Sequence, residues 1–203
     1  MTIAGKLITF FPLLHFLLVF DSALTLCRLP GLGSLLWLLF WIYAFPVIAY
    51  KIHNRFFPIE EGTSSIIGEY SPWYGGHMIQ SLFVYFPALE RVIRLVPGLF
   101  SVWLRLWGSS IGRDVSWTPH FELEDRAFMD VGNNAVFEHG VKASCHLISP
   151  SREDILKLVI KKIKIGEGAF VGGATVMAPG VEIEPGAFVE EGTYLCPDDL
   201  VTK

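Results

Sequence analysis

The feature that most constrains this chain is a run of apolar residues at every sixth position near its C-terminal end. Across residues 165–195 they are Ile165, Val171, Met177, Ile183, Val189 and Leu195. Neither the 3.6-residue period of a helix nor the two-residue period of an ordinary strand produces this spacing. Six residues make one short strand and a corner, so three repeats close one triangular coil of a hexapeptide β-helix. We expect each sixth side chain to point into the prism and stack on the neighbouring coils.

Glycines stand near these apolar positions, at Gly166, Gly172, Gly180 and Gly186. Glycine suits corners where the backbone needs a positive φ or a close approach. The alternative is a β-sandwich with regular turns, but its strands usually recur about every 8–12 residues. The pattern therefore predicts an all-β parallel β-helix.

The six-residue period also occurs upstream, and one insertion breaks it. Ile111, Trp117 and Leu123 keep the period, which restarts at Val131 after a slip of two residues. It then breaks between His146 and Ile163, and we expect an irregular loop there. A loop that interrupts a rigid scaffold is a common place for functional residues.

Composition indicates contact with a membrane. Hydrophobic residues make up 52% of the chain, charged residues only 18%, and the mean hydropathy is +0.46. Such values exceed those of ordinary soluble domains. Residues 109–203 carry nine Lys and Arg against fifteen Asp and Glu, and this acidic balance argues against nucleic-acid binding. Three widely spaced cysteines predict neither a disulfide framework nor a CxxC metal site, so a reducing compartment is expected.

Two hydrophobic segments lie near the N-terminus. Residues 31–50 contain no charged side chain, and twenty helical residues span the ~30 Å hydrocarbon core. Residues 7–26 form a shorter apolar segment whose core ends at Asp21. This segment is either a signal-peptide core or, as we prefer, the first arm of a hairpin that turns near residues 28–31.

Basic residues at the ends of this hairpin predict its orientation. Lys6 stands at one end, and Lys51 and Arg55 stand at the other. The positive-inside rule then places both termini in the cytoplasm. The alternative is that both segments lie in the plane of one leaflet. In either case residues 1–55 are expected to form a membrane-embedded α-helical region.

Residues 56–108 are expected to connect the membrane region to the repeats. Residues 56–77 are rich in Gly and Pro, and Tyr74 and His77 in this stretch are candidates for contact with an acceptor substrate. Residues 78–107 are amphipathic and basic, and Trp103 and Trp107 favour helices at the membrane interface. The alternative is helices that pack on the core of the next domain. The repeat domain would then occupy residues 109–203.

The residues around the insertion resemble a known family. The letters SCH at 144–146 precede the insertion, and IKIGEGAFVGGATVMAPGV at 163–181 follows it. This arrangement resembles the hexapeptide-repeat acyltransferases, and within them the maltose, galactoside and capsule-type O-acetyltransferases. The preceding hydrophobic helices look like those of membrane-attached members of that family.

The resemblance implies a left-handed parallel β-helix that forms a homotrimer with active sites between neighbouring prisms. It implies a histidine general base, with direct attack of an acceptor hydroxyl on the thioester of an acyl-CoA or an acyl-carrier protein. No metal and no tightly bound cofactor is then expected. An imidazole titrating near neutrality suits this proton removal. With the hydrophobic N-terminal half, these features predict acylation of a lipid or cell-envelope precursor by a catalytic domain that faces the cytoplasm.

The resemblance places the general base at His146, and His139 is the runner-up. A catalytic histidine usually needs an orienting group. Glu138 is the first candidate for that role, and the others are Asp130, Glu153 and Asp154. Two alternatives to catalysis remain. One is a non-catalytic trimeric membrane scaffold, and the other is a γ-type carbonic anhydrase with a metal on three histidines, His120, His139 and His146.

The same resemblance places donor-binding residues along the repeats. Gly172, Gly173 and Ala178 match backbone positions beside a pantetheine arm. Small residues of the family are replaced here by Glu190 and Glu191, which would repel the phosphates of coenzyme A. We therefore expect lysines to supply the positive charge, chiefly Lys162 and Lys164 beside Lys161, or an acyl-carrier protein to be the donor.

Overall fold

The computed structural model describes residues 3–66, 70–150 and 156–203. The chain forms two compact units. The first unit comprises residues 1–59 and 66–86, and the second comprises residues 60–65 and 87–203. The chain therefore enters the second unit briefly at residues 60–65 before it completes the first.

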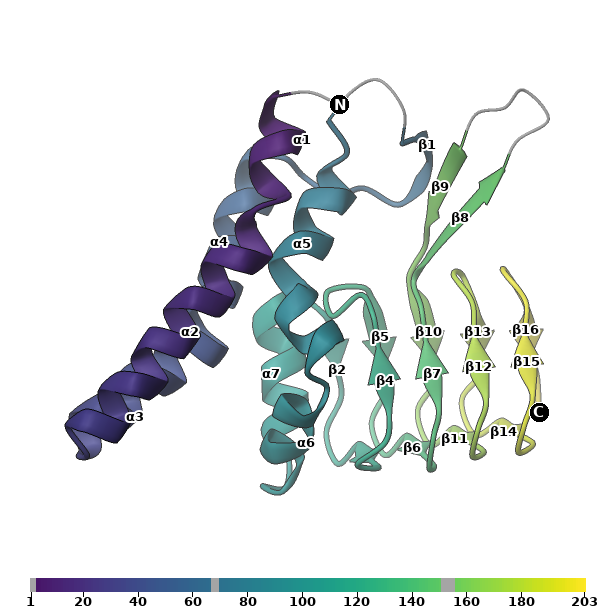
Figure 1. The fold of residues 1–203 in the computed structure, drawn as a ribbon. Helices are drawn as coiled ribbons and strands as arrows, with labels where there is room; N and C mark the ends of the chain where they lie inside the picture. The colour runs from purple at the N-terminus through teal and green to yellow at the C-terminus, as the bar shows by residue number, and fades with distance from the viewer. Residues whose placement is uncertain (1–2, 67–69, 151–155) are drawn as a thin grey trace. The chain divides into compact units, whose positions relative to one another are not determined.

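The first unit is helical (Figure 1). Its elements are α1 (Ile3–Ile8), α2 (Phe11–Arg28), α3 (Leu32–Leu39), the π-helix η1 (Phe40–Ala44), α4 (Phe45–Phe56) and α5 (Pro72–Tyr85). The stretches Gly5–Arg28 and Leu32–Phe56 are each long and apolar enough to cross a membrane. Helix α2 ends at Arg28 and α3 begins at Leu32, so the chain turns at residues 29–31, close to where the sequence predicts the turn of the hairpin.

A buried histidine compensates for a proline in this hairpin. Pro46 has no backbone N–H, and the N–H of Phe45 reaches back to the carbonyl of Phe40 in the π-helix. The carbonyl of Trp41 therefore has no helical donor. His15 Nε2 lies 2.8 Å from that carbonyl, and His15 is buried. Since a carbonyl only accepts, Nε2 carries the proton, and the bond joins α2 to the second arm.

Helix α5 packs closely against α4. Ser71 caps its first turn, and its Oγ accepts from the N–H of Tyr74 at 3.4 Å. A Cβ added to Gly76 would lie 3.1 Å from Tyr50 Cε2 on α4 and 2.7 Å from Ile59 Cδ1, which follows α4 in the chain. The glycine therefore permits the contact. The sequence predicts a loop-like connector over residues 56–77, but α5 begins at Pro72 and its buried residues belong to the core of the first unit.

Three parallel sheets form the prism of the second unit (Figure 1). The first sheet contains β2 (Ser110–Ile111), β5 (Met129–Val131), β10 (Ile163–Ile165), β13 (Glu182–Ile183) and β16 (Leu200–Val201). The second contains β3 (Ser116–Trp117), β6 (Val136–Phe137), β11 (Phe170–Val171) and β14 (Phe188–Val189). The third contains β4 (Glu122–Leu123), β7 (Lys142–Ala143), β12 (Val176–Met177) and β15 (Tyr194–Leu195).

The strand register confirms the parallel β-helix that the six-residue period predicts. Ile165 pairs with Ile183, so one coil takes 18 residues. Side chains at the sixth positions fill the core, and both Val171 and Met177 are 0% exposed. Burial of one such side chain contributes about 1.5–3 kcal/mol. The first coil takes 20 residues, since Leu123 pairs with Ala143, and the two extra residues lie before β5.

Two helices cover the first coil of the prism, namely α6 (Ala88–Arg94) and α7 (Leu99–Trp107). Trp103 and Trp107, expected at a membrane interface, are instead buried in this cap, so the core-packing alternative describes that face of α7. The carboxylate of Glu90 is buried with the guanidinium of Arg126 and accepts from Trp103 Nε1 at 3.3 Å. The opposite face of α7 exposes Val102 and other apolar side chains.

The insertion is not the irregular loop that we expected. It folds as a β-hairpin of β8 (His146–Pro150) and β9 (Leu156–Ile160), which projects from the coils in Figure 1. Strand β1 (Gly62–Ser65) adds to the free edge of β9 in antiparallel register. Apolar residues of β9 are buried, which anchors the ribbon. Glu153 and Asp154 lie outside the described residues.

Candidate active site

His146 stands where the chain leaves the prism. It follows the third sheet, at the corner that leads to the first sheet, and it is the first residue of β8. We call residues 144–146 the His146 corner. Because Leu123 pairs with Ala143, residues 124 and 125 of the preceding coil lie beside this corner. The side chain of His146 is 14% exposed.

A buried carboxylate holds the imidazole. His146 Nδ1 lies 2.7 Å from Asp125 Oδ2, and the side chain of Asp125 is 3% exposed. The N–H of Cys145 donates to the same oxygen at 3.0 Å, which fixes the carboxylate. Because a carboxylate only accepts, Nδ1 carries the proton and Nε2 is the basic nitrogen. This is the arrangement of a general base with an orienting carboxylate.

The surroundings raise the pKa of His146 above 6.5. Burial works to lower that pKa, but the hydrogen bond to Asp125 and the charges of Asp125 and Glu124 outweigh it. The charged imidazole therefore stabilises the fold fully below pH 6.5, and this contribution is lost as pH rises through the raised pKa. A general base must be neutral, so activity is expected to rise across the same pH range.

A second carboxylate lies beside the basic nitrogen. Glu124 Oε2 is 3.7 Å from His146 Nε2, and its side chain is half exposed. Ser144 Oγ donates to this oxygen at 2.9 Å. The corner thus presents a neutral base flanked by an accepting carboxylate and a hydroxyl. These groups suit a substrate that brings a proton to Nε2.

The cysteine in this corner is not a nucleophile. Cys145 is fully buried, and its Sγ donates to the carbonyl of Phe128 at 3.2 Å. Burial, assisted by the charge of Asp125, raises the pKa of the thiol well above its usual value. The thiolate required for attack is therefore disfavoured.

The structure places His139 and Glu138 at a different corner, between the second and third sheets. His139 is exposed, and its ring centroid lies 4.6 Å from that of His120. Glu138 Oε2 accepts from the N–H of Gly173 at 3.2 Å. The carboxylate that orients His146 is therefore Asp125, and Glu138 is not in contact with that histidine. Asp130 is exposed on the first sheet.

The three histidines considered for a metal do not meet. His120 and His139 share one corner, and His146 lies at the next. Over the described ranges, no three His, Cys, Asp or Glu side chains are grouped so that they could hold a metal ion. The arrangement therefore does not support the three-histidine site of a γ-type carbonic anhydrase.

The candidates for the pantetheine contact divide between corners. Ala178 lies at the His146 corner in the following coil, since the N–H of Ser144 reaches the carbonyl of Met177. Gly172 and Gly173 lie at the corner of His139. The N–H groups of Gly172 and Ala178 bond to carbonyls of the next coil, at 3.0 and 3.1 Å. A Cβ on Gly172 would lie 2.7 Å from the carbonyl oxygen of Val189, so close stacking of coils already requires glycine there.

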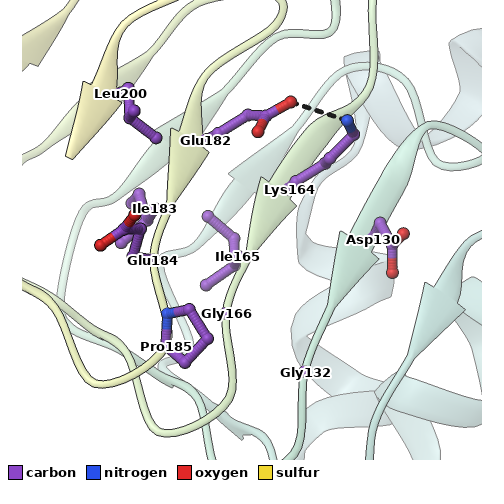
Figure 2. Close-up of a pocket in the computed structure, with 10 residues that line it drawn as sticks. All are labelled: Asp130, Gly132, Lys164, Ile165, Gly166, Glu182, Ile183, Glu184, Pro185 and Leu200. Carbon is purple, nitrogen blue, oxygen red and sulfur yellow. Dashed lines mark hydrogen bonds and ion pairs between the residues drawn. The ribbon is translucent and has the colours of Figure 1, made fainter. Parts of the chain in front are cut away.

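Each lysine expected to supply positive charge has an acidic partner. Lys164 Nζ lies 2.7 Å from Glu182 Oε1 on the outer face of the first sheet (Figure 2). Lys162 Nζ lies 3.9 Å from Glu61, and its backbone N–H also donates to that carboxylate. Lys161 pairs with Asp198. The groove drawn in Figure 2 is lined by three carboxylates and one lysine, which is unfavourable for a phosphate.

The candidates for acceptor contact lie on α5 in the first unit. Tyr74 Oη is 3.1 Å from Thr9 Oγ1, which joins α5 to the start of the chain. The ring of His77 stacks on Trp73, with 5.2 Å between centroids. Both residues therefore belong to a helix rather than to the loop that the sequence suggested.

Sequence reasoning missed Asp125 and Glu124, although a signal was present. The slip of two residues makes the first coil 20 residues long. Asp125 therefore lies one coil before residue 145, which directly precedes His146. A register drawn with that slip would have placed Asp125 against Cys145. The orienting carboxylates expected from the sequence are either close to His146 along the chain or lie in the same coil when a regular coil length is assumed.

We expect Asp125→Asn to slow catalysis and to shift its pH dependence. An amide can donate to Nδ1 and favour the wrong tautomer, so the maximal rate should fall by on the order of 100-fold or more. Loss of the charge lowers the pKa of His146, so the acidic limb of the pH–rate profile should move to lower pH. Glu124→Gln is the control, because it should move the limb in the same direction with a small loss of rate. An unchanged profile in Asp125→Asn would contradict the assignment.

Comparisons with known proteins give the following results. No protein-family model and no curated protein matches the chain. Solved structures that are similar include a hexapeptide-repeat acetyltransferase from Vibrio cholerae, at 16% identity and TM-score 0.42, covering 61% of this chain and 90% of that chain. A galactoside acetyltransferase in complex with coenzyme A has 13% identity and TM-score 0.44, covering 76% and 90%. A maltose O-acetyltransferase from Clostridium difficile has 14% identity and TM-score 0.37, covering 59% and 84%. The proposed function therefore rests on the geometry of the site.

Proposed function

We propose that this protein is a membrane-bound O-acyltransferase that moves an acyl group from a thioester to a hydroxyl of a lipid or cell-envelope precursor. The observation that carries the proposal is the Asp125–His146 pair, a buried carboxylate that fixes an imidazole with its basic nitrogen at a corner of the prism. The hexapeptide-repeat pattern on both sides of the insertion supports the same reaction.

The reaction follows from the geometry of the pair. His146 Nε2 takes the proton of the acceptor hydroxyl as its oxygen bonds to the carbonyl carbon of the thioester. The resulting imidazolium is stabilised by Asp125 through Nδ1–H. The tetrahedral intermediate then collapses, the carbon–sulfur bond breaks, and the departing sulfur takes the proton from Nε2. The protein returns to its starting state, and a thioester is already activated enough to need no covalent acyl-enzyme.

The donor is an acyl-CoA or an acyl-carrier protein. Glu190 and Glu191 are exposed on the last coil, and the neighbouring lysines are paired with carboxylates. A nucleotide diphosphate finds little positive charge on these coils. The proposal therefore requires both classes of donor to be assayed.

Membrane attachment is supported by the first unit. Few side chains are buried in its two apolar stretches, Gly5–Arg28 and Leu32–Phe56. A hydrophobic acceptor dissolved in the bilayer requires an enzyme attached to the membrane, which would explain this unit. A water-soluble sugar acceptor would not require it. Lys6, Lys51 and Arg55 support cytoplasmic ends for the hairpin.

We also propose that the prism assembles as a homotrimer. Outward positions of the second sheet form an apolar stripe, in which Phe170 and Phe188 stack with 5.1 Å between ring centroids. Phe188 is 63% exposed in the single chain, and Tyr194 on the third sheet is 66% exposed. A neighbouring prism on these faces would bury the stripe and provide the second wall of a cleft.

Phe188→Asp should prevent assembly of the trimer. A carboxylate buried in the apolar contact lacks a partner, so the detergent-solubilised protein should be monomeric by light scattering and inactive. Leu200→Asp is the matched control, because Leu200 is equally exposed, at 59%, on the first sheet outside the proposed contact. A Phe188→Asp variant that retains the mass of a trimer would contradict this interface.

The acyltransferase assignment has a direct test. Purified full-length protein is incubated with an acyl-CoA or acyl-carrier protein and a membrane lipid extract, and the release of free thiol and the mass of new lipids are measured. We expect thiol release that depends on the lipid, together with an ester product. If no donor releases thiol in any extract, the protein is instead a non-catalytic scaffold.

A further inference from the structure

The first unit contains a pocket that the proposed catalysis does not use. The pocket has a volume of about 400 Å³, within the usual range for small-molecule sites. Its walls are mostly apolar. Leu7, Phe10, Phe11 and Leu14 come from the start of the chain, and Phe57 follows the end of α4. Two polar side chains, His53 and Tyr70, complete the lining.

His53 and Tyr70 are hydrogen-bonded to each other, and the second ring nitrogen of His53 is not used by this bond. Tyr70 Oη lies 2.7 Å from His53 Nε2, and His53 is 9% exposed. Its other ring nitrogen, Nδ1, is buried and has no hydrogen-bond partner among the residues that the structure describes. Buried polar atoms in native proteins are rarely left without a partner. This nitrogen is closed to solvent in the structure, so a ligand atom in the adjoining pocket reaches it only after a small shift of the lining side chains.

A glycine keeps the pair in this position. A Cβ added to Gly75 on α5 would lie 2.0 Å from Tyr70 Oη and 2.3 Å from His53 Nε2. Any larger residue at this position would push the pair away from the helix. The arrangement of His53 and Tyr70 is thus built into the packing of α5.

We propose that this pocket binds the alkyl chain and the uncharged hydroxyl head of a single-chain lipid. The apolar walls suit the chain. Among the described residues, those lining the pocket include no Lys, Arg, Asp or Glu, so nothing there neutralises an anionic head. A hydroxyl both donates and accepts, so it satisfies His53 Nδ1 in either tautomer. The proposal concerns binding and does not depend on catalysis by His146.

The first experiment measures binding to the unsubstituted full-length protein in detergent. A hexadecanol that carries a diazirine at its distal end is photolysed with the protein, and the labelled peptides are mapped by mass spectrometry. We expect labelling within residues 7–14, which line the apolar part of the pocket, and competition by plain hexadecanol at concentrations at least about tenfold lower than by hexadecane or palmitate. Equal competition by all three would overturn the proposal, because it would indicate partition into any apolar surface.

Substitutions locate the site. His53→Leu and Phe57→Ala should each reduce labelling at least about tenfold, because one removes the ring nitrogen and the other removes a wall. Phe56→Ala is the matched control, since Phe56 is 73% exposed and does not line the pocket. Gly75→Ala leaves both lining residues present but displaces the pair, so it should also reduce labelling. Labelling of Phe57→Ala and Phe56→Ala to the same extent would refute the site.

One further variant separates this proposal from the proposed enzyme. His146→Ala lies in the other unit and should retain full labelling. Labelling that survives in His146→Ala but fails in His53→Leu supports the pocket whatever the assay of acyl transfer shows. Loss of labelling in His146→Ala would overturn the independence of the two sites.

Discussion

His146→Ala is expected to lower the rate of acyl transfer by about 10²- to 10⁴-fold, the usual contribution of a general base. Without the imidazole, the acceptor hydroxyl keeps its proton while it attacks the thioester, and no group replaces the Asp125–His146 pair. The measurement is thiol release in the lipid-dependent assay, at saturating donor. The mass of the assembly should not change, because the side chain lies at a corner and not in the proposed trimer contact.

The matched control for this variant is His139→Ala. His139 is exposed at the neighbouring corner, where its ring contacts His120 and no buried carboxylate holds it among the described residues. We expect this variant to keep full activity. The reverse result, with His139→Ala inactive and His146→Ala active, would move the base to the corner that contains Gly172 and Gly173 and would refute the mechanism given above.

Glu90→Ala is expected to destabilise the cap of the prism by about 3–5 kcal/mol, because it leaves a buried arginine without its counter-charge. Arg126 and Glu90 are 1% and 3% exposed, and Arg94 lies on the same carboxylate at 3.8 Å. Burial has already lowered the pKa of Arg94 to about 10. Chemical denaturation followed by tryptophan fluorescence measures the effect, since Trp103 donates to Glu90.

Two comparisons make this prediction specific. Glu122→Ala removes an exposed pair with Lys142, whose atoms are 3.0 Å apart, and should cost less than about 1 kcal/mol. Glu90→Leu combined with Arg126→Met removes both buried charges and should recover most of the stability that Glu90→Ala loses. A loss in Glu90→Ala no larger than that in Glu122→Ala would show that the cap does not depend on the pair.

The prism was predictable because its signal is local. Every strand of the prism has an apolar side chain at its inward position. Six such residues at a constant spacing, among them Ile165 and Met177, are therefore enough to identify the fold. The choice of His146 as the candidate base followed from the family resemblance and from its place before the break in the period. The fold of the break itself was not predictable, because β9 pairs with β1 from a segment about a hundred residues earlier, and no periodicity connects them.

Other parts of the site depended on register or on burial. Asp125 became visible only when the first coil was known to be longer by two residues. Trp103 and Trp107 resemble interface anchors in composition, and only the contacts of Glu90 and the first coil show that they are buried. The role of Gly75 could not be deduced from sequence, because it depends on the positions of two side chains from other segments.

The pairing of β1 with β9 has a consequence for how the chain folds during synthesis. Strand β1 leaves the ribosome soon after the helical hairpin, yet its partner is made only after two coils of the prism have been specified. Until then β1 presents an unpaired edge, which is a hazard for association with other chains. Thr63, Ser64 and Ser65 make that edge polar, which limits such association. The ribbon that begins at His146 is completed only when β9 has been made, so the His146 corner should acquire its final form after the first two coils of the prism have been synthesised.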